Sequence, residues 1–137
     1  LLILAAPNPA EATAGLNAVC ELLDTMRYST VDLENPKGTL AWLAYTIARP
    51  GTYLSGEANA GPGMSIAYLA APPLEGVYAV ERALKAADVV VGAFTKPPSE
   101  TNYMGALLTG TQSACRAACR AFEEAVFAVA TSPTAFQ

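Results

Sequence analysis

The chain contains a strand–loop–strand–helix unit that limits the folds open to it. Two apolar runs, Asp88–Thr95 and Met104–Thr109, flank the polar loop Lys96–Tyr103, and a helix rich in small residues follows from Gln112. Short apolar runs bounded by turn residues are typical of buried strands. We therefore expect a hairpin with a helix that follows it directly.

The loop between these two strands is longer and stiffer than most hairpin tips. It contains one cation, one anion, two prolines and an aromatic residue. The prolines reduce the conformational entropy that the loop loses when it becomes ordered. We interpret it as a loop that meets a ligand, a partner or a pore; the alternative is an ordinary exposed hairpin tip. Its residues are Lys96, Pro97, Pro98, Ser99, Glu100, Thr101, Asn102 and Tyr103.

Apolar runs and helical spacing predict the other elements. Leu1–Ala6 and Met64–Ala71 are expected to be strands, and Tyr28–Gly38 is either a linker or a strand with poor alternation. Strands and helices alternating around a small sheet indicate an α/β or α+β layer fold. Helices are expected at Pro9–Arg27, Thr39–Arg49, Leu74–Asp88 and Gln112–Thr131.

Each of the three longer helices has one apolar stripe that is expected to face the core. The cysteines are interpreted as small core residues, because three thiols do not make a disulfide framework and two thiols four apart do not make a metal site. The stripes are Leu16, Val19, Cys20, Leu23 and Met26; Val77, Val80, Leu84 and Ala87; and Cys115, Ala118, Phe122, Ala125, Val126 and Val129.

Composition favours association with other proteins and excludes two classes of partner. The chain is 53% hydrophobic and 15% charged, against about 25% charged in an average soluble domain. Exposed apolar surface usually marks an interface, although a high alanine content also raises the hydrophobic fraction. The net charge of −4 argues against binding of nucleic acid. No apolar stretch approaches the roughly 20 residues that span a bilayer.

The sequence has no histidine, which excludes a Ser-His-Asp triad and the commonest zinc ligand. Gly61-Pro62-Gly63 lacks the lysine and hydroxyl residue of a phosphate loop. No enzyme, cofactor or metal site is therefore expected. Glu75 remains as a candidate ligand residue near the end of a strand; the alternative is that it only interacts with the dipole of the helix that it begins.

Two distant segments resemble one another. Leu1–Leu4 and Ala106–Thr109 are apolar strands that each precede a helix of small residues, about one domain length apart. The chain also begins without methionine, in the middle of an apolar run. Both features suggest two copies of one domain, the first of them truncated.

Several strings of residues together resemble a known family. They are Ala67-Tyr68-Leu69, Ala71-Pro72-Pro73-Leu74-Glu75, Ala83-Leu84-Lys85-Ala86-Ala87-Asp88, Pro97-Pro98-Ser99-Glu100-Thr101-Asn102-Tyr103 and Leu108-Thr109-Gly110, with Cys115 and Cys119 beyond, and upstream Pro7–Ala12 and Gly51–Ser55. The chain resembles the tandem-domain shell proteins of bacterial microcompartments, of the types used for ethanolamine or ethanol utilisation. The resemblance is thin only between Tyr28 and Gly38.

The resemblance implies a fold and an assembly. Residues 28–137 would form a circularly permuted shell domain with an antiparallel-rich sheet flanked by helices, and residues 1–27 would be the last strand and helix of a truncated first domain. Three two-domain chains would form a flat pseudohexamer that tiles with other shell proteins. The expected location is the shell of a cytoplasmic microcompartment.

The resemblance also implies roles for the two candidate sites. The loop Lys96–Tyr103 would line the central pore of the homotrimer and open or close it by moving. Glu75 would contact an amine at a smaller pore, because a cationic amine requires an acidic partner. The solutes would be of the ethanolamine, ethanol or acetaldehyde class. The alternative function is a ligand-binding module of the same fold that senses a metabolite.

Overall fold

The computed structural model describes residues 5–25, 29–32, 39–97, 99 and 101–132. The described strands form one antiparallel sheet in the order β1-β2-β3-β5-β4. The elements along the chain are α1 (Pro9–Thr25), β1 (Ser29–Asp32), β2 (Thr39–Ile47), α2 (Thr52–Glu57), β3 (Ser65–Ala71), α3 (Pro73–Ala86), β4 (Val89–Thr95), β5 (Met104–Gly110) and α4 (Gln112–Thr131).

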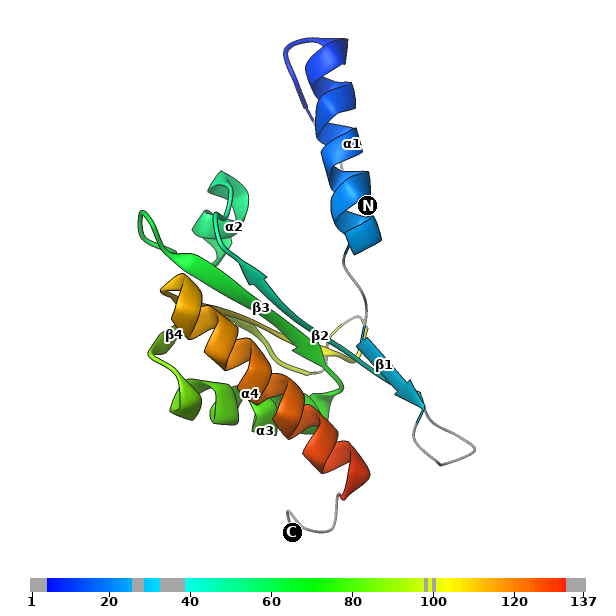
Figure 1. The fold of residues 1–137 in the computed structure, drawn as a ribbon, viewed down its shortest axis with the longest axis vertical. Helices are drawn as coiled ribbons and strands as arrows, with labels where there is room; N and C mark the ends of the chain where they lie inside the picture. The colour runs from blue at the N-terminus through cyan, green and yellow to red at the C-terminus, as the bar shows by residue number, and fades with distance from the viewer. Residues whose placement is uncertain (1–4, 26–28, 33–38, 98, 100, 133–137) are drawn as a thin grey trace.

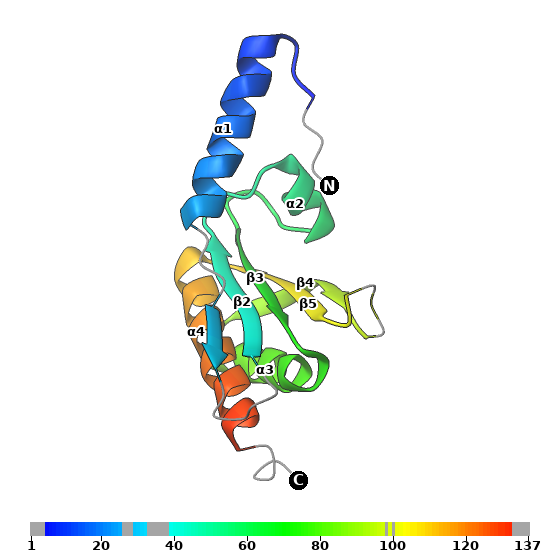
Figure 2. The ribbon, with the colours of Figure 1, turned by 90° about the vertical axis from the view of Figure 1, so that its right-hand side faces the viewer.

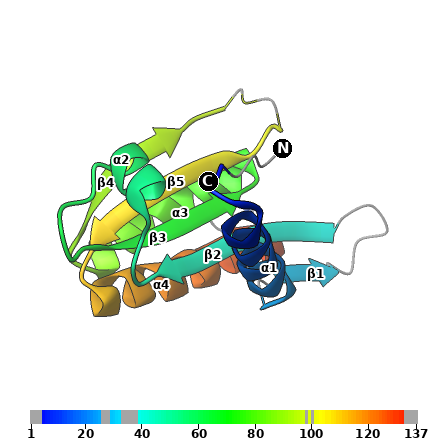
Figure 3. The same cartoon turned by 90° about the horizontal axis from the view of Figure 1, so that it is seen from above.

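The helices lie in different positions relative to the sheet. Helices α3 and α4 run side by side and cover one face (Figure 1). The short helix α2 lies at the other face, which no other described helix covers (Figures 2 and 3), and α1 stands away from the sheet (Figure 2). We call this second face the open face. This arrangement confirms the predicted mixture of helices and antiparallel sheet.

The core lies between the sheet and the layer formed by α3 and α4. Alternate residues of β3 and β5 point into it, as the pleat of a strand requires. Phe122 of α4 is the largest fully buried side chain there. The sheet side of this core is formed by six strand residues, each at most 2% exposed: Ala67, Leu69, Ala71, Met104, Ala106 and Leu108.

Helix α4 begins directly after β5, as the sequence predicted. Thr111 caps it: the hydroxyl oxygen of Thr111 accepts a hydrogen bond from the backbone nitrogen of Ala114 at 3.2 Å. The predicted apolar stripe of α4, from Cys115 to Val129, is buried at every position. The predicted strands Met64–Ala71, Asp88–Thr95 and Met104–Thr109 are also confirmed within one or two residues.

The stripe predicted for α3 is wrong in part. Val80 is buried as expected, but Val77 is 46% exposed. The buried face consists instead of Gly76, Ala79, Val80 and Ala83. Small residues allow a close approach: a Cβ on Gly76 would overlap the side chain of Met104. Steric fit, rather than the hydrophobicity of single residues, sets the rotation of this helix.

The helix predicted at Thr39–Arg49 is also wrong, since Thr39–Ile47 forms strand β2. Residues at every second position face α4, where the hydroxyl of Thr46 lies 3.4 Å from the Cys119 sulfur. Residues on the other face, such as Leu43 and Tyr45, are also apolar. With both faces apolar, neither a twofold nor a helical period stands out.

The first helix is confirmed, but the burial predicted for its stripe is wrong at Leu16 and Cys20; Val19 is half-buried, and the side chains of Leu23 and Met26 lie outside the described residues. Leu16 is 51% exposed and Cys20 is exposed, because α1 lies away from the sheet (Figure 1). Asn8 caps α1 by accepting from the Glu11 backbone nitrogen at 2.9 Å and donating to the Glu11 carboxylate at 3.0 Å. Most of the predicted strand Leu1–Ala6 lies outside the described residues.

The segment 28–38 contains strand β1 at Ser29–Asp32, the second of its two predicted alternatives, and its remaining residues lie outside the described ranges. Helix α2 is absent from the sequence-based predictions, which placed no element at Thr52–Glu57. At six residues it is too short to show a clear period.

We predict that Phe122→Ala lowers the free energy of unfolding by about 3–5 kcal/mol, because it leaves a cavity in the core. Phe127→Ala on the same helix is the control: Phe127 is 46% exposed, so we expect a loss below about 1 kcal/mol. Urea unfolding followed by circular dichroism measures both. Equal losses would contradict the assignment of the core.

Candidate functional site

The loop Lys96–Tyr103 connects β4 to β5 and holds its shape by its own hydrogen bonds. The Ser99 hydroxyl donates to the Tyr103 carbonyl oxygen at 2.7 Å, and the Asn102 backbone nitrogen donates to the Ser99 carbonyl oxygen at 3.1 Å. Asn102 adopts a φ of 57°, a left-handed conformation that asparagine tolerates better than most residues. Pro98 and Glu100 lie outside the described residues.

Several side chains of this loop are accessible. Lys96, Thr101 and Asn102 are exposed, and Tyr103 is 37% exposed. The described residues of the loop therefore present a cation, hydroxyl and amide groups and an aromatic ring to their surroundings.

Glu75 lies in the first turn of α3, shortly after β3 ends. It is half-buried. Its carboxylate makes neither a hydrogen bond nor an ion pair with any residue in the described part of the chain. This carboxylate remains available to a ligand, and it is also well placed to interact with the helix dipole.

The structure brings the two candidate sites to the same end of the sheet. Ala71, the last residue of β3, pairs with Met104, the first residue of β5. The end of the loop therefore lies beside the end of β3, from which the chain leads to Glu75. Exposed apolar side chains are also found at this end: Leu74 is 73% exposed and Phe94 is 42% exposed. Apolar surface of this kind is typical of an interface.

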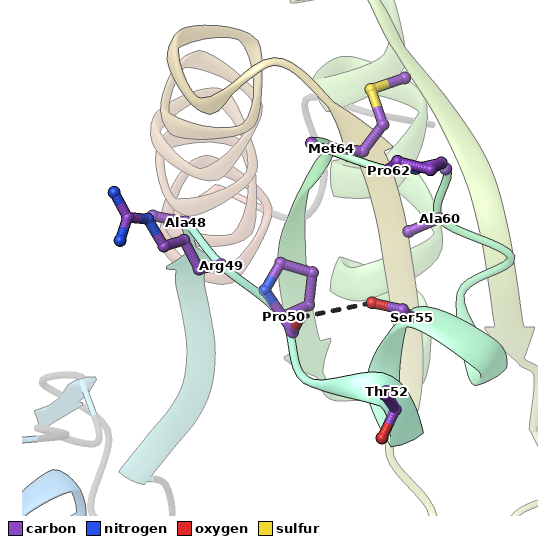
Figure 4. A pocket seen from close by; sticks show the side chains of 10 residues that line it. Ala48, Arg49, Pro50, Thr52, Ser55, Ala60, Pro62 and Met64 are labelled. Atoms are coloured by element: carbon purple, nitrogen blue, oxygen red, sulfur yellow. Dashed lines mark hydrogen bonds between the residues drawn. The ribbon is translucent and has the colours of Figure 1, made fainter.

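A hollow of about 520 Å³ lies at the opposite end of the sheet (Figure 4). It is lined by the turn after β2 and by the turn before β3, and the Ser55 hydroxyl donates to the Pro50 carbonyl oxygen at 3.4 Å beside it. Arg49 is the charged residue of its lining, and its guanidinium points away from the hollow in Figure 4. Size alone does not make it a candidate site.

Sequence reasoning missed a second hollow, of about 230 Å³, between α2 and the open face of the sheet. Tyr53 and Glu57 of α2 line it together with Tyr68 of β3. A tyrosine and a glutamate four residues apart lie on the same side of a helix. The sequence shows this spacing, but it indicates a shared side only where a helix is predicted, and no helix was predicted at Thr52–Glu57.

The thiols of α4 are buried. Desolvation raises the pKa of Cys115 and Cys119, although the hydrogen bond with Thr46 acts against the shift at Cys119. Cys20 is exposed on α1, so its prediction as a core residue is wrong. In the described ranges, no three His, Cys, Asp or Glu side chains gather where they could hold a metal ion. The described helices also include none with the length and apolarity to cross a bilayer.

No protein-family model matches the chain. It is 49% identical over 135 residues to the bacterial microcompartment shell protein EutL of Clostridium perfringens (strain 13 / Type A), covering 98% of this chain and 61% of that protein. It is 45% identical over 133 residues to EutL of Escherichia coli (strain K12), covering 97% of this chain and 60% of that protein. The chain thus spans about three fifths of the length of these relatives.

Solved structures agree with these matches. The crystal structure of EutL from Clostridium perfringens superposes with a TM-score of 0.86 at 49% identity, covering 96% of this chain and 59% of the other. The trimeric shell protein PduB superposes with a TM-score of 0.75 at 22% identity, covering 95% of this chain and 57% of the other. EtuB from Clostridium kluyveri superposes with a TM-score of 0.60 at 21% identity, covering 77% of this chain and 45% of the other. At these lower identities the likeness concerns the fold alone.

The comparisons confirm the predicted resemblance to microcompartment shell proteins. The match is stronger with EutL than with EtuB. The relatives are named as shell proteins, which agrees with the expected non-enzymatic role and disfavours the sensing module.

We predict that Cys20 reacts quickly with a thiol reagent in the folded protein, whereas Cys115 and Cys119 react only after unfolding.

The folded pKa values of these two thiols are raised, so between about pH 8.5 and the folded values the unfolded chain has lost protons that the folded chain keeps. Stability should therefore fall as the pH rises through this window.

The pH effect can be measured by urea unfolding at neutral and alkaline pH. The double variant Cys115→Ala, Cys119→Ala is less stable overall, but it should lose less further stability on going to alkaline pH than the parent protein. An equal alkaline loss in both proteins would show that these thiols are not responsible.

Proposed function

We propose that this chain, homologous over nearly its whole length to EutL, forms part of a structural shell protein of a cytoplasmic bacterial microcompartment. The observation that supports this best is 49% identity over 135 residues together with a TM-score of 0.86 against the EutL structure. The protein would act without catalysis or a cofactor, by building the shell and by passing small solutes.

The proposed assembly is a homotrimer that tiles with other shell proteins. PduB, a shell protein with a similar fold, is described as trimeric. In this chain, the exposed side chains of Leu74, Val77 and Phe94 offer apolar surface for such contacts. Only 15% of the residues are charged, so little charged surface opposes association.

We further propose that residues 1–27 are the end of a first shell domain and that residues 28–137 form a second, circularly permuted one. Two features support this division. Helix α1 stands away from the sheet (Figure 1), and Leu16 on it is 51% exposed, as expected for a helix whose own domain lies elsewhere. A tandem pair in each of three chains would make the tile a pseudohexamer.

The loop Lys96–Tyr103 is proposed to line the central pore and to gate it. Hydrogen bonds within the loop join Ser99 to Asn102 and Tyr103, and the Tyr103 backbone nitrogen to the Thr101 hydroxyl. A loop closed on itself can swing as a unit about its ends without breaking sheet hydrogen bonds, as discrete gating transitions require. Lys96 and Tyr103 would then face solutes of the ethanolamine, ethanol or acetaldehyde class.

Glu75 is proposed as the residue that selects an amine. Its carboxylate has no ionic partner among the described residues. The end of β3 that leads to Glu75 lies beside the end of the loop Lys96–Tyr103. A charge-assisted hydrogen bond from an ammonium group is about twice as strong as one between neutral groups. Ethanol or acetaldehyde does not require this carboxylate.

The shell role is tested by the assembly state of the protein. We expect light scattering to give the mass of a trimer and negative-stain images to show flat tiles. Leu74→Asp with Phe94→Asp should shift the protein toward monomers, since both side chains are exposed in one chain and a charge there opposes contact. A stable monomer before substitution would contradict the proposal.

The amine role of Glu75 predicts that Glu75→Gln weakens ethanolamine binding about tenfold, the loss of about 1.4 kcal/mol from one charged contact. Calorimetry on the assembled protein measures it. Glu81→Gln is the control, because Glu81 is exposed and pairs with Lys85 at 3.7 Å. Unchanged affinity in Glu75→Gln would leave Glu75 with its helix-dipole role alone.

A further inference from the structure

Helix α2 is fixed against the open face of the sheet by a close backbone contact. A Cβ on Gly92 of β4 would overlap the carbonyl oxygen of Ala58, the residue after α2. Ala58 is fully buried, and the register of β4 shifts at this place, between Val91 and Ala93. Glycine at position 92 thus lets the end of α2 rest on the edge of the sheet.

The hollow of about 230 Å³ lies beside this contact, with α2 as one wall. Figure 3 shows α2 lying over β3 and β5. Small residues of the neighbouring strands β4 and β5 leave the hollow its depth; they are Ala93, Thr95 and Gly105. A Cβ on Gly105 would make only ordinary contacts, 3.8 Å from the Thr95 Cβ. The space above Gly105 is therefore open.

Two aromatic rings border the hollow and remain exposed. Tyr53 of α2 is 75% exposed and Tyr68 of β3 is 37% exposed. Tyr68 points away from the α3 and α4 layer, since its neighbours Ala67 and Leu69 face the core. Two aromatic residues kept accessible at one hollow are more than packing of this domain requires.

The charge beside these rings is negative. Glu57 lines the hollow and has no ion-pair partner in the described part of the chain. No lysine or arginine is among the described residues that line this hollow, and Arg49 lines a neighbouring hollow that shares Leu54 and Tyr68 with it. A carboxylate together with aromatic faces attracts organic cations and repels anions.

We propose that this hollow binds a small organic ammonium ion, held between the rings of Tyr53 and Tyr68 and the carboxylate of Glu57. The alkyl groups of such an ion would contact the rings and Leu107, and its charge would face Glu57. The site lies on the face opposite α3, and so apart from Glu75. It does not depend on the proposed shell role.

The test is a nuclear magnetic resonance titration of the protein with choline and with dimethylbutanol, the neutral carbon analogue of choline. We expect choline to bind at least about tenfold more tightly, with shifts at the amides of Tyr53, Glu57 and Tyr68. Binding should weaken as salt is added. Equal affinities for the two compounds, or no saturable shift with choline, would overturn the proposal.

Variants locate the site. Tyr53→Ala and Glu57→Gln change exposed side chains, so the fold is retained, and each should weaken choline binding about three- to tenfold. Gly105→Val fills the floor of the hollow and should abolish binding. Gly56→Ala, where an added Cβ meets nothing within 4 Å, is its control. Glu75→Gln should leave choline binding unchanged. Unaltered binding in Glu57→Gln and Gly105→Val would overturn the proposal.

Discussion

Close packing of small residues between the sheet and the helix layer is the constraint on which the rest of this structure depends. Gly76 brings α3 against Met104, and the alanines of both helices let Phe122 fill the space above β3 and β5. Because the interior is packed at crystal-like density, a larger side chain at Gly76 would displace the buried Met104 side chain or α3 itself. The positions of Glu75 and of the strand ends follow from this contact.

The two faces of the sheet have different tasks as a result. The face under α3 and α4 holds the buried apolar residues, whereas the open face holds accessible tyrosines and the hollow beside α2. The antiparallel pairing of Ala71 with Met104 places the candidate pore loop and the start of α3 at one end. A stable helix-covered face thus supports loops and side chains that are free to meet solutes or other chains.

Much of this arrangement could be predicted from the sequence, where one pattern was dominant. Helix α4 has a clear helical period and strands β3 to β5 are short apolar runs bounded by turn residues, and all were predicted. Strand β2 was not, because Leu43 and Tyr45 on one face are as apolar as Trp42 and Ala44 on the other. The hollow depends on the contact between Gly92 and Ala58, which are far apart in the sequence, so no local pattern indicates it. The loop itself was predicted, but its role rests on homology.

In the proposed trimer, the loops Lys96–Tyr103 of three copies meet around one axis. Pulsed electron paramagnetic resonance tests this arrangement with a spin label at Thr101→Cys, in a Cys20→Ser background because Cys20 is the exposed cysteine. We expect short distances with the signature of three coupled spins, and longer distances for a label at Phe127→Cys. Labels at position 101 that are far apart, or isolated, would contradict it.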